Sequence, residues 1–339
     1  MLRTGPVPAA PKIDFSSRVT GLLRQEHKVF RLSANTVGVA DPELMSSLVA
    51  TRAVLPGERS VFKPVRGKAV SDELAMRVIR ALGEDVNRAL ESAVPSLAGK
   101  WPRRGQTVLR DMLFGTDGAR LSALTNPRIL DSDAISRGAD MLVAAFPGDS
   151  EARSSLSRMV TDCPTYPQRR HIIALYRRAS ALLIGGLSGL VANASWLLSH
   201  RDTPADVTNS LWETMRLLPT AWMLWRTPDP EYTELHPLIG KDDSIALFPL
   251  LMHRDPDFWE APDSFIPERW EDGDGYRTPG FAPFGLLGAR CWARHLIIPL
   301  AQRLIEELTA QRLRPRVRGD AAPVPLRSLL SVRVELAAA

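Results

Sequence analysis

The chain has 339 residues, of which 45% are hydrophobic and 24% charged, and its formal net charge is +5. This composition predicts a soluble globular protein that is long enough to bury a sizeable core. No dense Lys/Arg block with interleaved aromatic residues occurs, so the sequence argues against nucleic-acid binding. Two cysteines, Cys163 and Cys291, cannot make a disulfide framework or a zinc cluster. They favour a reducing compartment, the cytoplasm.

The first half of the chain predicts short strands followed by amphipathic helices. Residues 29–32 and 37–40 are predicted to be strands. Asp41-Pro42-Glu43 then predicts a helix start, because it supplies a capping carboxylate, a proline at the first helical position and an acid near the positive end of the dipole. Residues 50–69 look like a loop. From Leu74 to Val94 apolar residues recur every four positions, which predicts a helix.

An uncharged segment, Ala179 to Leu198, is long enough to be considered as a membrane span. It contains several glycines and small polar residues, and arginines stand close to both ends. A central helix buried on all sides of a globular protein has the same pattern. We therefore predict a buried helix and no membrane association.

The second half predicts further elements around a long loop. A helix is expected near 210–218, a strand at 245–248, a Pro/Gly/Asp-rich loop over 255–283, a helix from Cys291 through Leu308, and a closing strand at 332–336. Since no repeat or linker occurs, we expect one domain over residues 1–339, mainly α-helical with small β-sheets.

The strongest local feature is the segment from Phe281 to Cys291, a Gly-rich loop that brings one cysteine to the start of a helix. Backbone N–H groups and the helix dipole at such a position favour a thiolate over a thiol. A thiolate is a strongly donating axial ligand for haem iron. The alternative is a buried structural cysteine.

This loop resembles the haem-binding loop of the cytochrome P-450 family. Pro283-Phe284-Gly285 matches the family's Pro-Phe-Gly, with Phe284 seven positions before the cysteine. The resemblance implies haem b as cofactor, Cys291 as its axial iron ligand, and Phe284 and Arg290 as cofactor-binding residues. The loop departs from the family at three positions. Gly288 and Arg290 each stand one position closer to the cysteine than the family's Gly and Arg, and Ala293 replaces a glycine.

A second resemblance lies upstream of the loop. Glu213 and Arg216 stand three apart on a predicted helix, so their side chains can pair, although such pairs usually lie on solvated faces. Residues 265–270 resemble the family's Pro-Glu-Arg-Phe segment, which implies that Arg269 completes a buried structural triad with Glu213 and Arg216. The family also implies Arg226 as a haem-propionate ligand. The alternative is an ordinary surface arginine.

The chain departs from the family in two further regions. Gly185-Gly186 fits the start of the oxygen-activating run on the central helix, but the catalytic acid and threonine positions hold Ser188 and Gly189. The alternative is that this helix only packs. The early helix that grips the propionates has no match among the basic residues near 52–68, and the connection before Glu213 is short. We expect a cytochrome P-450 fold that is shortened in these two regions.

Two hypotheses of function follow from the resemblance. The first is a haem-dependent oxidoreductase, a monooxygenase that oxidises a small organic molecule in specialised metabolism. A ferredoxin-type donor would supply its electrons, with Arg290 and Arg294 as contact candidates. The second is a family member that has lost catalysis and activates a partner enzyme such as a glycosyltransferase. The missing acid and threonine favour this helper, whereas Cys291, Arg226 and the triad favour the enzyme, because a helper does not need the thiolate.

Overall fold

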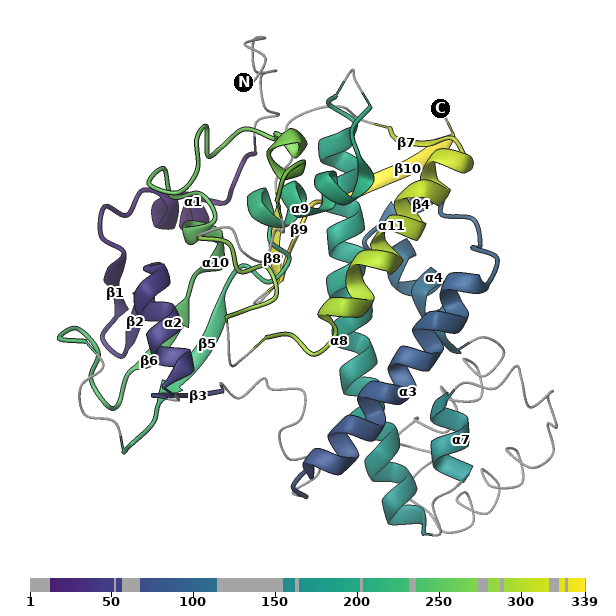
Figure 1. Ribbon diagram of the computed structural model, residues 1–339, viewed down its shortest axis with the longest axis horizontal. Helices are drawn as coiled ribbons and strands as arrows, with labels where there is room; N and C mark the ends of the chain where they lie inside the picture. Colours follow the sequence, from purple (N-terminus) through teal and green to yellow (C-terminus); the bar gives the residue numbers. More distant parts are fainter. Residues whose placement is uncertain are drawn as a thin grey trace. The chain divides into compact units, whose positions relative to one another are not determined.

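Figure 1 shows the protein as a computed structural model. Two compact units are distinguished within it, and each is described by itself. The first unit comprises Met1–Ser60, Leu97–Arg104 and Gly186–Ala339, and the second comprises Val61–Ser96 and Gly105–Gly185. The single domain expected over 1–339 stays a prediction. The structure describes residues 13–51, 53–56, 68–114, 155–161, 165–201, 204–231, 236–273, 280–286, 290–316, 323–326 and 329–338.

The first unit contains a five-stranded sheet with the strand order β1-β2-β6-β5-β3. Strands β2 and β6 pair in parallel, and the other neighbours are antiparallel. The helix α2 lies over β2 and β6 in Figure 1, and its Met45, Leu48 and Val49 pack into one buried cluster with residues of these strands. The elements are β1 (Val29–Ser33), β2 (Thr36–Val39), α2 (Pro42–Ala50), β3 (Val54–Pro56), β5 (Leu224–Pro228) and β6 (Ser244–Leu247).

The helix α9 (Val207–Leu217) is part of the first unit. Asp206 caps this helix by accepting a hydrogen bond from the backbone N–H of Asn209 at 2.8 Å. The helix packs against the 3₁₀ helix η2 and against α11, which fixes the face that carries Glu213. η2 spans Pro267–Trp270 and α11 spans Arg294–Ala310. Two further helices of the unit are α1 (Ser17–Leu23) and α10 (Pro249–Met252).

Two small antiparallel sheets complete the first unit. One has the order β4-β10-β7, and the other pairs β8 with β9. A single bridge between Ala221 and Leu329 joins β9 to the segment that follows α9. The strands are β4 (Gly99–Trp101), β7 (Leu313–Pro315), β8 (Val324–Leu326), β9 (Leu329–Ser331) and β10 (Val334–Ala338).

The second unit is helical in its described part and is organised around a buried carboxylate. Asp85 on α3 has no exposed surface and accepts a hydrogen bond from the Tyr176 hydroxyl on α8. It also accepts one from the Ser155 backbone N–H at 2.8 Å. The helices are α3 (Asp72–Glu91), α4 (Arg103–Phe114), α7 (Ser155–Thr161) and α8 (Tyr166–Leu198), of which α4 and α8 continue into the first unit.

Within the described residues one helix, Pro167–Leu198, is long and apolar enough to cross a membrane. However, 72% of its apolar window is buried inside the protein, as in the core helix of a soluble protein. By itself the helix is therefore weak support for a membrane span. This result agrees with the sequence prediction of a buried central helix.

The mainly helical fold with small sheets is confirmed. Most predicted elements are found within a few residues of their expected bounds, and two differ. The central helix begins at Tyr166 rather than near Ala179, because its first turns carry charges on an outer face and so lack a continuous apolar pattern. The prediction of a loop over residues 50–69 is wrong at Val54–Pro56, because this segment is the strand β3 and pairs with β5. Most of the remainder of that segment lies outside the described residues.

Candidate functional site

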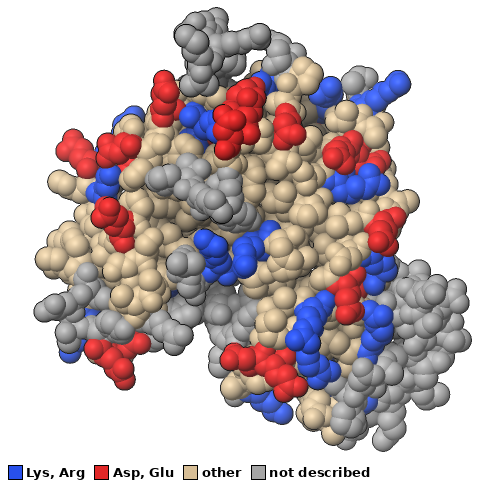
Figure 2. All heavy atoms as spheres, in the orientation of Figure 1, with Lys and Arg blue, Asp and Glu red and all other residues tan. Residues whose placement is uncertain are grey.

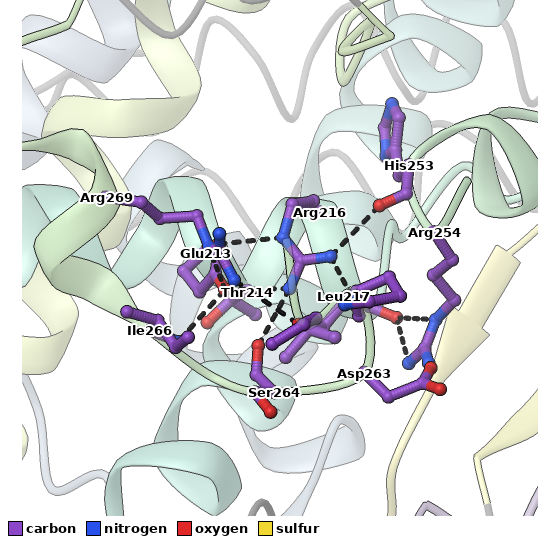
Figure 3. Close-up of polar contacts among 12 residues, drawn as sticks. Glu213, Thr214, Arg216, Leu217, His253, Arg254, Asp263, Ser264, Ile266 and Arg269 are labelled. Carbon is purple, nitrogen blue, oxygen red and sulfur yellow. Dashed lines mark hydrogen bonds and ion pairs between the residues drawn. The ribbon is translucent and has the colours of Figure 1, made fainter. Parts of the chain in front are cut away.

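Glu213 and Arg216 form the centre of a buried ion cluster on α9 (Figure 3). The guanidinium of Arg216 donates two hydrogen bonds to the Glu213 carboxylate, at 2.9 and 2.8 Å. Arg269 from η2 donates a third at 3.2 Å. The backbone N–H of Ile266 and the indole N–H of Trp270 add two more, each at 3.0 Å. Five donors therefore satisfy a carboxylate that has no exposed surface.

The remaining N–H groups of Arg216 bind three backbone carbonyls. The acceptors are His253 at 3.0 Å, Pro262 at 2.6 Å and Ser264 at 2.8 Å. The side chain of Arg216 has no exposed surface, so these contacts fix α9 to the end of α10 and to the loop before η2. The pairing expected for Glu213, Arg216 and Arg269 is thus present in the structure. That the triad is structural, rather than in contact with substrate, stays a prediction.

Cys291 stands two residues before Ala293, the residue that caps the start of α11. Its backbone N–H donates to the Phe284 carbonyl at 2.6 Å, and Arg294 donates to its carbonyl at 3.4 Å. Burial raises the pKa of the Cys291 thiol, although the Ala293 N–H and the charge of Arg294 act in the opposite direction. The expectation that the helix start favours the thiolate is therefore wrong for the free cysteine, because burial outweighs the helix N–H groups. A coordinated metal ion would remove the proton.

The loop before Cys291 is described at its two ends. Phe284 is buried and packs edge-to-face on Trp212, with ring centroids 6.1 Å apart. Gly285 has a φ of 82°, a left-handed conformation that glycine adopts without strain. Gly288, whose spacing departs from the family, lies outside the described residues. Arg290 is exposed, and its assignment to the cofactor stays a prediction.

Arg226 lies on β5 and is partly buried. Its guanidinium donates to the carbonyl of the preceding residue at 2.7 Å, and no carboxylate of the described residues lies within ion-pair distance. Burial lowers the pKa of this side chain. A partly buried cation without a protein counter-charge has a desolvation cost that an incoming carboxylate would offset. Arg226 and Cys291 are therefore chemically suited to an iron porphyrin with propionate groups.

The oxygen-activation positions on α8 are tightly packed. Ser188 is fully buried. A Cβ atom added to Gly189 would lie 3.0 Å from Cγ2 of Thr220 and 3.5 Å from Cβ of Ser331. Glycine thus allows α8 to approach both neighbouring segments closely, and a threonine at 189 would not fit without a shift. This packing favours the alternative reading of the helix at Gly189.

Two buried polar residues near the site were not assigned a role from the sequence. Asn193 on α8 donates to the carbonyls of Leu218 and Leu330, at 3.0 and 3.3 Å, and accepts from the Val332 N–H at 2.8 Å. His253 follows α10 and bonds to two segments. For Asn193, the sequence signal was a polar amide within an otherwise largely apolar, uncharged helix. His253-Arg254-Asp255-Pro256, which is typical of the family, was the signal for the second.

The cytochrome P-450 family model matches residues 207–291, the segment that holds the triad, Arg226 and Cys291. Cyclooctatin synthase of Streptomyces melanosporofaciens is 35% identical over 82 residues, which are 23% of this chain and 18% of that protein. The aligned segment thus spans about a fifth of this curated relative.

Solved structures match over nearly the whole chain. HmtT, involved in himastatin biosynthesis, is 14% identical with a TM-score of 0.61 and covers 92% of this chain and 94% of its own. HmtN, a post-tailoring hydroxylase of the same biosynthesis, is 12% identical with a TM-score of 0.61 and covers 95% and 97%. The fold is therefore the cytochrome P-450 fold. The segment with the triad and the cysteine loop also matches the model of the cytochrome P-450 family, whose members bind haem.

Proposed function

We propose that the protein is a haem-dependent monooxygenase in which Cys291 is the axial thiolate ligand of haem b. The observation that carries this proposal is a cysteine and an arginine within the segment that matches the family model. Cys291 is a partly exposed thiol three residues before α11, and the partly buried guanidinium of Arg226 has no carboxylate of the described residues within ion-pair distance. When bound, haem supplies the redox chemistry that activates dioxygen.

The protein contributes binding and orientation. The hydrogen bond from Cys291 N–H to the Phe284 carbonyl fixes the backbone beside the sulfur. Arg226 would bind a propionate, since a planar fork suits a carboxylate. Phe284 would supply an apolar contact to the porphyrin. Arg290 is exposed, which suits a propionate at the edge of the site or an electron donor.

A small organic substrate of specialised metabolism is supported by the relatives. Two similar structures belong to proteins of himastatin biosynthesis, and the aligned curated relative is a synthase of one natural product. We propose a ferredoxin-type donor that contacts Arg290 and Arg294. On the face shown in Figure 2, basic and acidic side chains lie interspersed among other residues. We also propose a cytoplasmic location without a membrane contact.

The reduced carbon monoxide complex tests the thiolate assignment. The purified protein should show the red-shifted Soret band of thiolate ligation. Cys291→Ala should abolish this band, because no other ligand is assigned to the iron. Cys163→Ala is the matched control and should keep it. An unchanged band after loss of Cys291 would contradict the proposal.

A second candidate function, the helper without catalysis, is favoured by the central helix. Ser188 and Gly189 provide neither an acid nor a threonine, and a larger side chain at position 189 would require Thr220 to shift. If the protein is a helper that activates a glycosyltransferase, the Cys291→Ala variant should activate this partner as well as the wild type does. The enzyme hypothesis expects haem and turnover that depend on Cys291. The two outcomes are separated by measuring haem content and partner activation on the same pair of proteins.

A further inference from the structure

His253 lies at the point where the buried ion cluster and the cysteine loop meet. It follows α10 directly and has no exposed surface. Its backbone carbonyl accepts a hydrogen bond from Arg216 at 3.0 Å. Figure 3 shows the imidazole extending away from Arg216, on the opposite side from this carbonyl. One residue therefore presents its main chain to the cluster and its side chain to another part of the unit.

Both ring nitrogens of His253 have backbone partners. Nδ1 lies 3.2 Å from the Met215 carbonyl on α9. Nε2 lies 2.9 Å from the backbone nitrogen of Ala282, at the start of the cysteine loop. Since the Ala282 N–H can only donate, Nε2 must be the acceptor, and the proton is on Nδ1, where it is donated to Met215. The environment thus selects one neutral tautomer.

The loop is held at the same place by apolar contacts. Phe281 packs against the imidazole of His253 in a tilted arrangement, with ring centroids 4.9 Å apart. It also contacts the rings of Trp270 and Trp212, at 4.8 and 6.2 Å. These contacts fix where the loop begins, but rings can slide against each other, whereas the hydrogen bond to Ala282 defines the direction of the backbone.

From Ala282 the order continues to the cysteine through backbone hydrogen bonds. The Gly285 N–H donates to the Ala282 carbonyl at 3.1 Å, and the Cys291 N–H donates to the Phe284 carbonyl at 2.6 Å. Hydrogen bonds therefore lead from Glu213 through Arg216, His253 and Ala282 to Gly285. Phe284, the residue before Gly285, then accepts the hydrogen bond from Cys291.

We infer that His253 is a positioning residue that couples the Glu213 cluster to the loop of Cys291, through the hydrogen bond from Ala282 N–H to its Nε2. It holds the loop that carries the thiol and does not touch substrate. Burial also lowers the pKa of His253 to about 3, so the acceptor stays available at neutral and mildly acidic pH. The role assigned to Cys291 rests on the proposed function, whereas the coupling itself does not.

The test measures how accessible the Cys291 thiol is in the haem-free fraction of the purified full chain. His253→Asn keeps a donor near the position of Nδ1 but is too short to reach Ala282. Alkylation of Cys291 by iodoacetamide, followed by mass spectrometry of its peptide, should be at least tenfold faster in this variant. His253→Gln, whose amide oxygen can reach further, should return the rate toward that of the wild type. In the haem-bound fraction, His253→Asn should also lower the share of the red-shifted carbon monoxide band.

Tyr176→Phe is the matched control, because it removes a buried hydrogen bond in the other unit. Equal alkylation rates in wild type and His253→Asn would overturn the inference, as would an equal acceleration in Tyr176→Phe. If His253→Asn gives no soluble protein, hydrogen exchange of the wild-type Ala282 amide decides, since the inference requires protection and an unprotected amide refutes it. A protein without haem that still shows the alkylation difference would end the proposed function and leave the coupling in place.

Discussion

Glu213 and Asp85 are two buried carboxylates that the protein treats differently. Neither has any exposed surface, and each pairs with an arginine three residues later on its own helix. Arg216, the partner of Glu213, is fully buried, whereas Arg88, the partner of Asp85, is 30% exposed. The same spacing on a helix therefore builds two different environments.

The difference lies in the number and kind of donors. Glu213 receives five N–H groups from two arginines, an indole and the backbone. Asp85 receives the Ser155 N–H, the Tyr176 hydroxyl and the partly exposed Arg88. Burial is the largest effect on Asp85, and it raises the pKa of this carboxyl in spite of these partners. The three partners of Asp85, one of which is partly exposed, therefore do not offset the cost of its burial.

Removing Glu213 should have the largest effect on stability. Glu213→Ala leaves two arginines without their carboxylate, of which Arg216 is fully buried, so the free energy of unfolding should fall by about 3–5 kcal/mol. Urea unfolding followed by circular dichroism measures this loss. The control is Glu84→Ala, because Glu84 pairs with Arg158 on the surface at 2.8 Å and such pairs contribute about 0–1 kcal/mol. Similar losses in both variants would show that the cluster is not the structural centre of its unit.

Tyr176→Phe should have a smaller effect. The substitution keeps the ring, which packs on Phe114 at 6.0 Å, and removes only the hydroxyl that serves Asp85. A hydrogen bond to a charged group contributes about 1.5–3 kcal/mol, and we expect a loss in that range by urea unfolding. A loss below about 0.5 kcal/mol would mean that the Ser155 N–H and Arg88 satisfy Asp85 without the tyrosine.

The two clusters were not equally predictable from the sequence. Glu213, Arg216 and Arg269 were recognised because their spacing and order match a family pattern. Asp85 was missed, although it lies on α3 between Leu82 and Val86, on the apolar face. Periodicity indicates which face is buried, but it does not reveal a partner such as Tyr176, which is 91 residues further along the chain.

The same limit applies to the strands and to the site. The pairing of Val54–Pro56 with β5 depends on a partner more than 160 positions away, so its local sequence looks like a loop. The contact of Gly189 with Thr220 and Ser331 and the bridge of His253 to Ala282 likewise depend on how distant segments meet. The sequence could indicate the elements and the ligand candidates. It could not indicate which long-range contact each polar residue makes.

The smallest expected effect is a pH dependence of stability that comes from Asp85. The pKa of Asp85 is raised in the folded protein, so between that value and the unfolded value near 4 the folded state binds more protons than the unfolded state. The stabilisation from this proton is complete below about pH 4 and is lost as the pH rises through the folded pKa. The slope can reach about 1.4 kcal/mol per pH unit for one proton.

His253 acts in the opposite direction, because its lowered pKa of about 3 makes the unfolded state bind the extra proton below about pH 6.5. The wild-type slope is therefore a sum, and Asp85→Asn isolates one part of it. The stability of this variant relative to wild type should improve as the pH is raised from 4 to 7, measured by urea unfolding at each pH. A difference between the two proteins that stays constant over this range would show that Asp85 titrates like an exposed carboxyl, and the effect assigned to its burial would then be wrong.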